Sequence, residues 1–184
     1  MHKILNKNNK ITILSIKSKK LTEKQLLAIC KLKNSFWVWS IQKQKLWFKK
    51  NLRSSDVNNL FYVNTNLVGY TCLRKRKAYI DNITINYFYL DSFIIKKNWR
   101  VEGLAKILIL YNNIYIIKNK TSSFLTCKKN LIKFYTKFGW KLLRKDRFKI
   151  INHKHRWFIN ESYVNGMTYN LDKNLKKKIL YSIS

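Results

Sequence analysis

Apolar residues in the middle of the chain predict a strand that leads into a helix. The segment from Tyr87 to Ile95 is rich in aromatic and β-branched residues and is closed by two lysines, which is typical of a buried strand. Beyond a short turn, apolar residues recur at the three- and four-residue spacing of one helix face: Leu104, Ile107, Leu108, Tyr111, Ile114 and Tyr115. The sequence therefore predicts a strand, a turn at residues 100–105, and a helix.

A second strand and helix follow the first pair. Residues 122–127 have a strand pattern, residues 128–138 have an amphipathic helical pattern, and Gly139 is a typical helix stop. The residues from Trp140 to Ile151 alternate enough for a strand or one arm of a hairpin, and residues 167–171 could close the sheet.

The N-terminal half predicts the remaining elements. Residues 10–17 form a moderate strand pattern, and the run Thr22-Glu23-Lys24-Gln25 has the form of a capping box at the start of a helix. A second helical pattern covers residues 41–48. Residues 60–73 read as a hairpin with an Asn-rich turn, and Gly69 in its second arm indicates a bulge or a close contact.

The turn at residues 100–105 has the chemistry of a phosphate cradle. The first N–H groups of a helix lack intrahelical partners, and the helix dipole favours an anion at that end. Gly103 allows the backbone to approach a phosphate closely because it has no Cβ, and Arg100 adds a positive charge. We interpret the turn as a pyrophosphate-binding site.

Two motifs in this order resemble the GCN5-related N-acetyltransferase (GNAT) superfamily. Arg100, Gly103 and Ala105 match its R/Q-x-x-G-x-G/A turn, with Ala in the third position. The segment from Phe134 to Trp140 matches its F-Y-x-x-x-G-F/W pattern. The resemblance implies an α/β (α+β) fold, with a mixed central sheet of about six or seven strands flanked by helices. It also implies a split between the fourth strand, ending near Ile95, and the fifth, ending near Cys127.

The resemblance implies an acetyl-CoA-dependent acyltransferase and assigns roles to particular residues. Acetyl-CoA is expected beside the strand end and on the turn, at Phe93, Ile94, Ile95, Arg100, Val101, Glu102, Gly103, Leu104 and Ala105. The region before the second helix commonly borders the acceptor, which makes Trp37 and Trp39 candidate acceptor contacts, although such aromatics are more often core residues. The acceptor is an amine of a small molecule, an amino sugar or a protein.

Acid–base residues are the second part of the expected chemistry. Tyr135 corresponds to the tyrosine that family members use to protonate the leaving thiolate, and the pKa values of a phenol and a thiol lie within about two units. The alternative is that Tyr135 only packs. Among the eight acidic residues, Asp91 on the strand that leads to the turn is the best candidate general base, and a water chain could replace it.

The length and composition of the chain favour one packed domain. Its 184 residues are 46% hydrophobic and 15% aromatic, and it has four glycines and no proline, which argues against long flexible linkers. We therefore expect a single acyl-CoA-binding domain over residues 1–184, with residues 173–184 as a basic, short amphipathic or frayed tail.

A net charge of +31 supports a second hypothesis. With 39 basic and 8 acidic side chains, the surface favours polyanions, so a GNAT-fold protein that is a non-catalytic RNA- or ribosome-bound component is the alternative function. The charge is spread along the whole chain, as lysine drift in an AT-rich genome would also leave it.

The remaining motifs point away from metals, membranes and secretion. The pair His153 and His155 lacks a third ligand nearby, and Cys127 at a strand end is expected to be a packed, inert thiol. Three scattered cysteines suit a reducing interior. No secretory signal or bilayer-length apolar run is present. These features predict a cytoplasmic protein without a metal or a membrane span.

Overall fold

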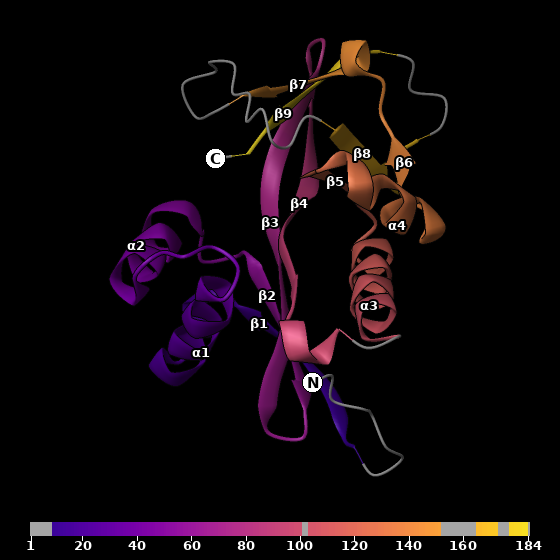
Figure 1. Cartoon of the computed structure of the whole chain (residues 1–184). Coiled ribbons are helices and arrows are strands. Elements are labelled where there is room, and N and C mark those ends of the chain that lie inside the picture. The colour runs from indigo at the N-terminus through magenta and orange to yellow at the C-terminus, as the bar shows by residue number, and fades with distance from the viewer. Residues whose placement is uncertain (1–8, 101–102, 152–164, 173–176, 184) are drawn as a thin grey trace. The chain divides into compact units, whose positions relative to one another are not determined.

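The computed structural model describes residues 9–100, 103–151, 165–172 and 177–183. The elements are β1 (Ile11–Lys17), η1 (Ser18–Lys20), α1 (Glu23–Asn34), α2 (Ile41–Asn51), β2 (Val57–Val63), β3 (Asn66–Ile80), β4 (Ile83–Ile95), η2 (Lys97–Trp99), α3 (Leu104–Lys118), β5 (Ser122–Cys127), η3 (Lys129–Leu131), α4 (Ile132–Lys137), β6 (Lys141–Leu142), η4 (Lys145–Arg147), β7 (Phe148–Ile151), β8 (Asn165–Tyr169) and β9 (Ile179–Ser182). Figure 1 shows these elements in chain order.

The strands are hydrogen-bonded in the order β1-β2-β3-β4-β5-β8-β6, with β9 pairing β3 and β7 pairing β9. The chain forms two compact units, Met1–Arg74 with Asp91–Ile109 and Lys75–Leu90 with Leu110–Ser184. The strands β3 and β4 and the helix α3 each contribute to both units.

The first unit is a sheet with helices on both faces. β1 pairs with β2, and β2 pairs with the first part of β3, both antiparallel. On one face, Leu60 of β2 and Tyr70 of β3 pack against Ile29 and Phe48, so α1 and α2 cover that face. On the other face, a second core joins β2, β3 and β4 to Trp99 and the start of α3. Its strand residues are Phe61, Val63, Val68 and Ile95, and its residues from α3 are Leu104 and Leu108.

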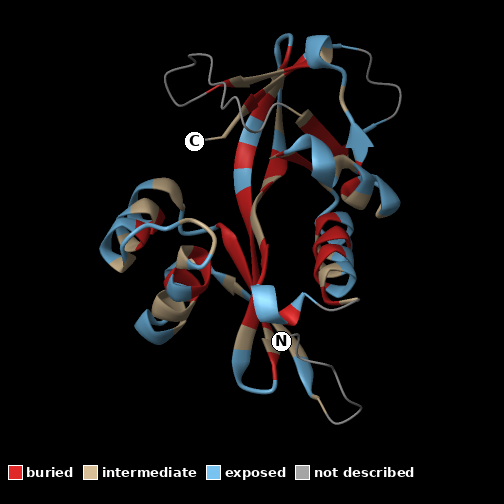
Figure 2. Ribbon diagram, viewed as in Figure 1, coloured by how far each residue is buried: buried red, intermediate tan, exposed pale blue. Residues whose placement is uncertain are grey.

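Local sequence signals explain how α1 begins and where the hairpin turns. Thr22 and Gln25 form the predicted capping box, with each side chain accepting from the other residue's backbone N–H, and α1 begins at the next residue, Glu23. Asn64 has φ +56° in the turn between β2 and β3, a conformation that Asn tolerates. Figure 2 shows the resulting contrast between the buried strand β2 and the exposed outer sides of α1 and α2.

The second unit is built around β5 and an aromatic core. Residues Tyr87–Tyr89 of β4 pair in parallel with Ser122–Phe124 of β5, and β5 pairs antiparallel with β8. The rings of Phe124 and Tyr181 stack with centroids 3.9 Å apart and 9° between their planes, and Tyr87 meets Tyr181 edge-on at 4.9 Å.

The predicted fold class is confirmed, with corrections in detail. A mixed sheet flanked by helices is present, and the parallel β4–β5 pair fits the expected split. The described residues form nine strands, more than the six or seven expected, because the C-terminal quarter contributes several short strands. The expectation of a frayed tail over residues 173–184 is wrong for residues 179–182, which form β9 with Ile179 and Tyr181 buried.

Candidate functional site

Gly103 is the described residue directly before α3, at the position of the predicted phosphate-binding turn. Gly103 has φ +100°, and among the described residues other than its chain neighbours no atom would lie within 4 Å of a Cβ placed on it. Its carbonyl accepts from Ile107 N at 2.9 Å, which starts the hydrogen bonding of α3. The first N–H groups of a helix have no acceptor within the helix, and here they follow directly after Gly103. Leu104 is fully buried and Ala105 half-buried, and both belong to the core under the turn.

The other predicted turn residues have mixed outcomes. Val101 and Glu102 lie outside the described residues. Arg100 is exposed, its Nε donates to the carbonyl oxygen of Ile95 at 3.2 Å, and its guanidinium carbon lies 4.8 Å from the centre of the Phe36 ring. The hydrogen bond ties the arginine to the end of β4, and the ring contact places it against the segment between α1 and α2.

The last three residues of β4 lie against the hydrophobic cores of the first unit. Ile94 and Ile95 are buried, and Phe93 is half-buried. Gly69 of β3 lies against this segment, because a Cβ on it would be 2.8 Å from Ile95 Cδ1 and 3.1 Å from the carbonyl oxygen of Ile94. The close contact that the sequence indicated at Gly69 is confirmed, and the β2–β3 register also shifts beside it, between Phe61 and Tyr62.

Asp91, the candidate general base, lies in a hydrogen-bonded cluster. Its Oδ2 accepts from Arg74 Nη1 at 3.1 Å, and its Oδ1 accepts from Ser92 Oγ at 2.9 Å. Arg74 is buried and also donates through Nη2 to the carbonyl oxygen of Asn51 at the end of α2. In the basic run Arg74-Lys75-Arg76-Lys77 of β3, Arg74 and Arg76 are only 5% and 1% exposed.

Lys33 is a member of this cluster that sequence reasoning missed. It is 4% exposed, its Nζ donates to Ser92 Oγ at 3.3 Å, and its ammonium lies 3.7 Å from the centre of the Trp47 ring. Burial lowers the pKa of this lysine, and the charge of Asp91 offsets part of the shift. The only sequence signal is that Lys33 falls in register with the buried residues Ile29 and Cys30 of α1.

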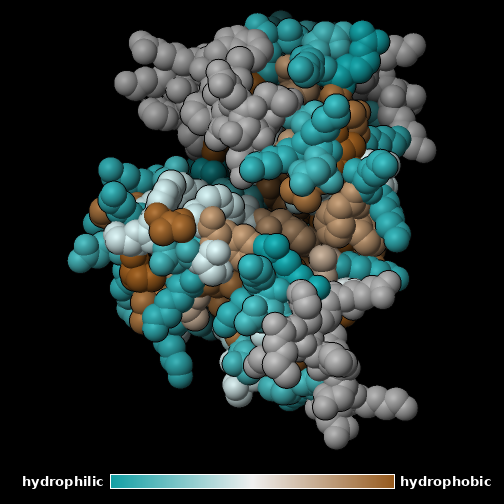
Figure 3. All heavy atoms as spheres, in the orientation of Figure 1, coloured by the Kyte–Doolittle hydropathy of each residue, from teal (hydrophilic) through white to brown (hydrophobic). Residues whose placement is uncertain are grey.

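The two candidate acceptor contacts differ in exposure. Trp37 is half-buried and packs on the core between α1, α2 and the sheet, while Trp39 is 47% exposed. Val38 between them is 91% exposed. Figure 3 shows hydrophobic residues at the surface of the α1–α2 region among hydrophilic ones. Trp39 is therefore the better placed of the two to meet a ligand, and Trp37 has a structural role in addition.

Tyr135 and Cys127 belong to the second unit. Tyr135 on α4 is 6% exposed and packs edge-on against Trp140, whose indole N–H donates to Asn113 Oδ1 at 3.0 Å. Gly139 between them has φ +84° and ends the helix, as the motif predicts. Burial raises the pKa of the Cys127 thiol to about 11, which keeps it protonated at neutral pH, as expected of a packed thiol.

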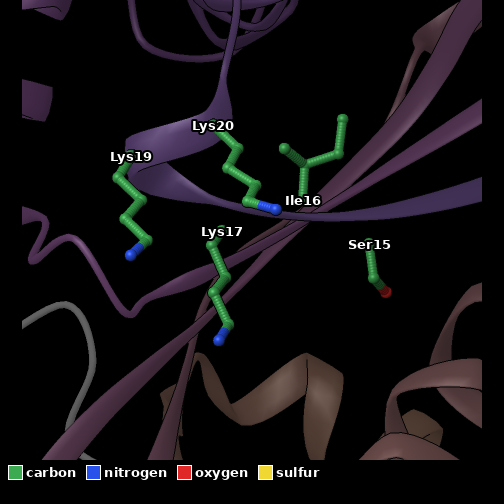
Figure 4. A pocket seen from close by; sticks show the side chains of 5 residues that line it. All are labelled: Ser15, Ile16, Lys17, Lys19 and Lys20. Atoms are coloured by element: carbon green, nitrogen blue, oxygen red, sulfur yellow. The ribbon is translucent and has the colours of Figure 1, made fainter.

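A surface concavity on the first unit concentrates positive charge. It has a volume of about 480 Å³ and is lined by Ser15, Ile16, Lys17, Lys19 and Lys20 of β1 and η1. Figure 4 shows its three lysine side chains leaving the end of the strand and the following 3-10 turn. All three lysines are exposed.

In the described ranges of the chain, no group of three or more His, Cys, Asp or Glu side chains is arranged to hold a metal ion. His153 and His155 lie outside these ranges. No described helix has the length and apolar character needed to cross a membrane.

Comparison with solved structures defines the class of fold. The chain aligns with YhbS of Escherichia coli, a GNAT family N-acetyltransferase in complex with CoA, at a TM-score of 0.66 and 14% identity over 99% of this chain and 93% of that one. ElaA of Escherichia coli gives a TM-score of 0.63 and 16% identity over 86% and 99% of the two chains. A GNAT family acetyltransferase of Staphylococcus aureus Mu50 gives 0.60 and 15% over 88% and 100%.

These likenesses show that the chain has the GNAT fold, and the resemblance inferred from its two motifs is confirmed at that level. No family model matches the sequence.

Proposed function

We propose that this protein transfers an acetyl group from acetyl-CoA to a primary amine. The observation that carries the proposal is Gly103, with its positive φ and open surroundings, at the start of α3 in a chain with the GNAT fold. A solved structure of similar fold is a complex with CoA. In this proposal, residues 1–184 form one acyl-CoA-binding domain. The enzyme needs no metal and acts in the cytoplasm.

The residues of the turn fit a diphosphate. The main chain of Gly103 and the N–H groups of Leu104 and Ala105 would hold the phosphate oxygens, assisted by the helix dipole. Arg100 would add charge-assisted hydrogen bonds. Val101 and Glu102 complete the proposed turn, and the main chain of Phe93, Ile94 and Ile95 would hold the acyl-bearing arm. Acetyl-CoA supplies a thioester that is activated toward nucleophiles.

The proposed reaction makes one bond and breaks one. The amine nitrogen attacks the thioester carbonyl carbon, the C–N bond forms, the C–S bond breaks, and the amine loses a proton while the sulfur gains one. We propose Tyr135 as the donor of the proton to sulfur. Asp91 or a water chain would take the proton from the amine. Both Asp91 oxygens already accept hydrogen bonds, which favours the water chain.

Two substitutions separate these roles from packing. Tyr135→Phe removes one oxygen atom and keeps the ring that packs on Trp140, so we expect kcat to fall about 100-fold or more with little change in the unfolding temperature. The assay measures thiol release from acetyl-CoA over a panel of primary amines. An unchanged kcat would show that Tyr135 only packs.

Asp91→Asn should change the pH–rate profile if Asp91 is the base, and should leave the shape of that profile unchanged if a water chain is the base.

The exposed Trp39 is the proposed acceptor contact, with Trp37 behind it. Trp39→Ala should raise KM for the amine and leave the affinity for acetyl-CoA unchanged, because its ring is 47% exposed and is not needed for the core. Trp37→Ala should also lower stability, because Trp37 packs on the core of the first unit. Equal KM values for Trp39→Ala and wild type would remove Trp39 from the proposed site.

Polyanion binding is the second candidate function, and the lysine concavity of β1 and η1 favours it. Three exposed lysines around one hollow, in a chain of net charge +31, would bind the phosphates of RNA or of a ribosome. Replacing Lys17, Lys19 and Lys20 by Gln should weaken RNA binding and reduce its salt dependence. The matched control replaces three other exposed lysines, Lys49, Lys50 and Lys43 of α2. Equal effects of both triple variants would assign RNA binding to net charge and not to the concavity.

A further inference from the structure

Ser92 has an unusual backbone conformation for a strand residue. Its φ is +59°, a left-handed value that is strained for a non-glycine residue and persists only where surrounding contacts impose it. The other described non-glycine residues with positive φ stand between elements or directly after one: Asn64, Asp81, Lys120 and Asn170. In the described chain, Ser92 is the one that lies inside a strand.

The left-handed residue breaks the alternation of β4. Asp91 contacts Arg74, which also binds the end of α2, and Ser92 contacts Lys33 of α1, so these two neighbours face the same side. In a regular strand, consecutive side chains point to opposite faces. After Ser92 the alternation resumes with the opposite phase: Ile94 packs toward α1 and α2, and Phe93 and Ile95 pack toward the start of α3.

This change of phase sets which groups β4 presents to the turn before α3. Phe93 and Ile95 belong to the core that contains Leu104 and Leu108. Moving the phase by one residue would exchange the two faces for every residue after Ser92. The left-handed conformation of Ser92 is therefore needed for the arrangement of β4 that the proposed acyl-CoA site uses.

A buried network holds Ser92 in this conformation. Its hydroxyl donates to Asp91 Oδ1 at 2.9 Å and accepts from Lys33 Nζ at 3.3 Å. Asp91 is in turn bound by Arg74 at 3.1 Å. The Lys33 ammonium is fixed by aromatic rings, with the centre of Trp47 at 3.7 Å and that of Phe48 at 5.1 Å.

We propose that Lys33 is a positioning residue of the acyl-CoA site, which acts by locking Ser92 in the left-handed conformation that orients Phe93 and Ile95. Lys33 itself touches neither substrate, because it is 4% exposed and enclosed by α1, α2 and β4. This inference rests on the proposed acetyl-CoA binding for its functional consequence, and on the geometry of Ser92 for its structural part.

Substitutions of Ser92 test whether the lock matters. Ser92→Ala and Ser92→Gly both remove the hydroxyl, but only glycine adopts φ +59° without strain. We expect Ser92→Ala to weaken acetyl-CoA binding about fivefold or more, and Ser92→Gly to change it less than twofold. Equal affinities of the two variants would overturn the proposal.

A double-mutant cycle tests Lys33 itself. Lys33→Met removes the ammonium group and keeps an apolar chain of four heavy atoms in place of the methylene stem of lysine. It should weaken acetyl-CoA binding about fivefold in the native background and less than twofold in the Ser92→Gly background. Lys31→Met, which removes an exposed lysine from the same helix, controls for the lost charge and should leave affinity within twofold. Equal losses in both backgrounds would overturn the proposal.

A second readout separates this inference from the proposed function. The backbone amide resonances of Phe93 and Ile95 report the conformation of β4 without any ligand. We expect them to move in Lys33→Met and in Ser92→Ala and to return toward native positions in the Lys33→Met, Ser92→Gly double variant. If wild type fails to bind acetyl-CoA while these resonances behave as expected, the proposed acetyltransferase function is wrong, and the proposal that Lys33 holds the conformation of Ser92 is supported. Unmoved resonances in both single variants would refute the lock.

Discussion

At the scale of single residues, the buried lysine of α1 is the least expected feature of the chain. Lys33 shares its surroundings with one carboxylate, Asp91, and with a second cation, Arg74. Desolvation outweighs the attraction of Asp91, so the pKa of Lys33 is lowered. A buried charged network of this kind contributes little net stability but is costly to leave incomplete. Its value to the protein lies in the conformation that it specifies at Ser92.

The lowered pKa of Lys33 predicts a pH-dependent stability. Between that lowered value and the usual lysine value of about 10.4, the unfolded chain binds more protons than the folded chain, so the free energy of unfolding rises with pH. We expect Lys33→Met to lack this rise in urea unfolding measured at several alkaline pH values. The exposed-lysine variant Lys31→Met should keep it.

The thiols of Cys30 and Cys72 near Lys33 make stability change with pH in the opposite direction, so the variant must be compared with wild type. Burial raises the pKa values of Cys30 and Cys72, and such groups lower stability as pH rises through their unfolded values. Both thiols are present in wild type and in Lys33→Met, and the charge of Lys33 lowers the pKa of Cys30, so the difference between the two curves reports the lysine together with its effect on Cys30. Parallel curves would contradict the assignment of a lowered pKa to Lys33.

At the scale of elements, the close packing of β3 on β4 positions the end of β4. The Gly69 site leaves no room for a side chain, since a Cβ would lie 2.8 Å from Ile95 Cδ1. We expect Gly69→Ala to lower the free energy of unfolding by about 1 to 3 kcal/mol through overpacking. In an Ile95→Val background, which removes that methyl group, the cost should be smaller. Full additivity of the two substitutions in thermal or urea unfolding would contradict this contact.

The stacked aromatic core makes β9 essential to the second unit. Tyr181 is 1% exposed and contacts both Phe124 and Tyr87. We expect Tyr181→Ala to cost about 3 kcal/mol, in line with large-to-small core substitutions. Leu180→Ala, at the half-buried neighbouring position of the same strand, should cost much less. Similar unfolding midpoints for the two variants would mean that residues 179–182 do not pack as β9.

The elements that could be predicted from the sequence are those with strong local signals. The capping box at Thr22 and the helical apolar spacing after Gly103 correctly predicted α1 and α3. The strand β9 follows a run of lysines and has only two buried side chains, so its four residues carry too little pattern to predict it. A short strand is stabilised by its partners, here β3 and β7, and local sequence does not specify such partners.

The candidate site could be predicted only in part, for the same physical reason. The Gly103 turn was predicted because its chemistry lies within six consecutive residues. The cluster of Lys33, Arg74, Asp91 and Ser92 depends on contacts over 17 and 59 residues of sequence separation, so periodicity gives no sign of it. Lysine and arginine are expected at the surface, and only the partner carboxylate and the aromatic rings explain their burial.

At the scale of the whole molecule, two properties favour two different proposed functions. The GNAT fold with Gly103 before α3 is the basis of the proposed acetyl-CoA binding, and the net charge of +31 favours attraction of polyphosphates. Salt concentration distinguishes acetyl-CoA binding at the proposed site from nonspecific attraction of polyphosphates. The affinity of nonspecific attraction falls steeply with ionic strength, and the affinity of a shaped site falls less.

The most direct test of the central claim is calorimetric titration of the nuclease-treated protein with acetyl-CoA at about 0.2 M salt, which strongly weakens nonspecific attraction of polyanions. Gly103→Trp is the matched variant, since its side chain would enter space in which a Cβ has no neighbour within 4 Å among the described residues, and dephospho-CoA is the matched ligand. Thermal unfolding confirms that the variant is folded.

We predict saturable one-to-one binding by wild type that Gly103→Trp weakens at least about tenfold, equivalent to 1.4 kcal/mol. Binding that vanishes at this salt concentration, or that the folded Gly103→Trp variant retains unchanged, would contradict the account and favour the polyanion-binding function.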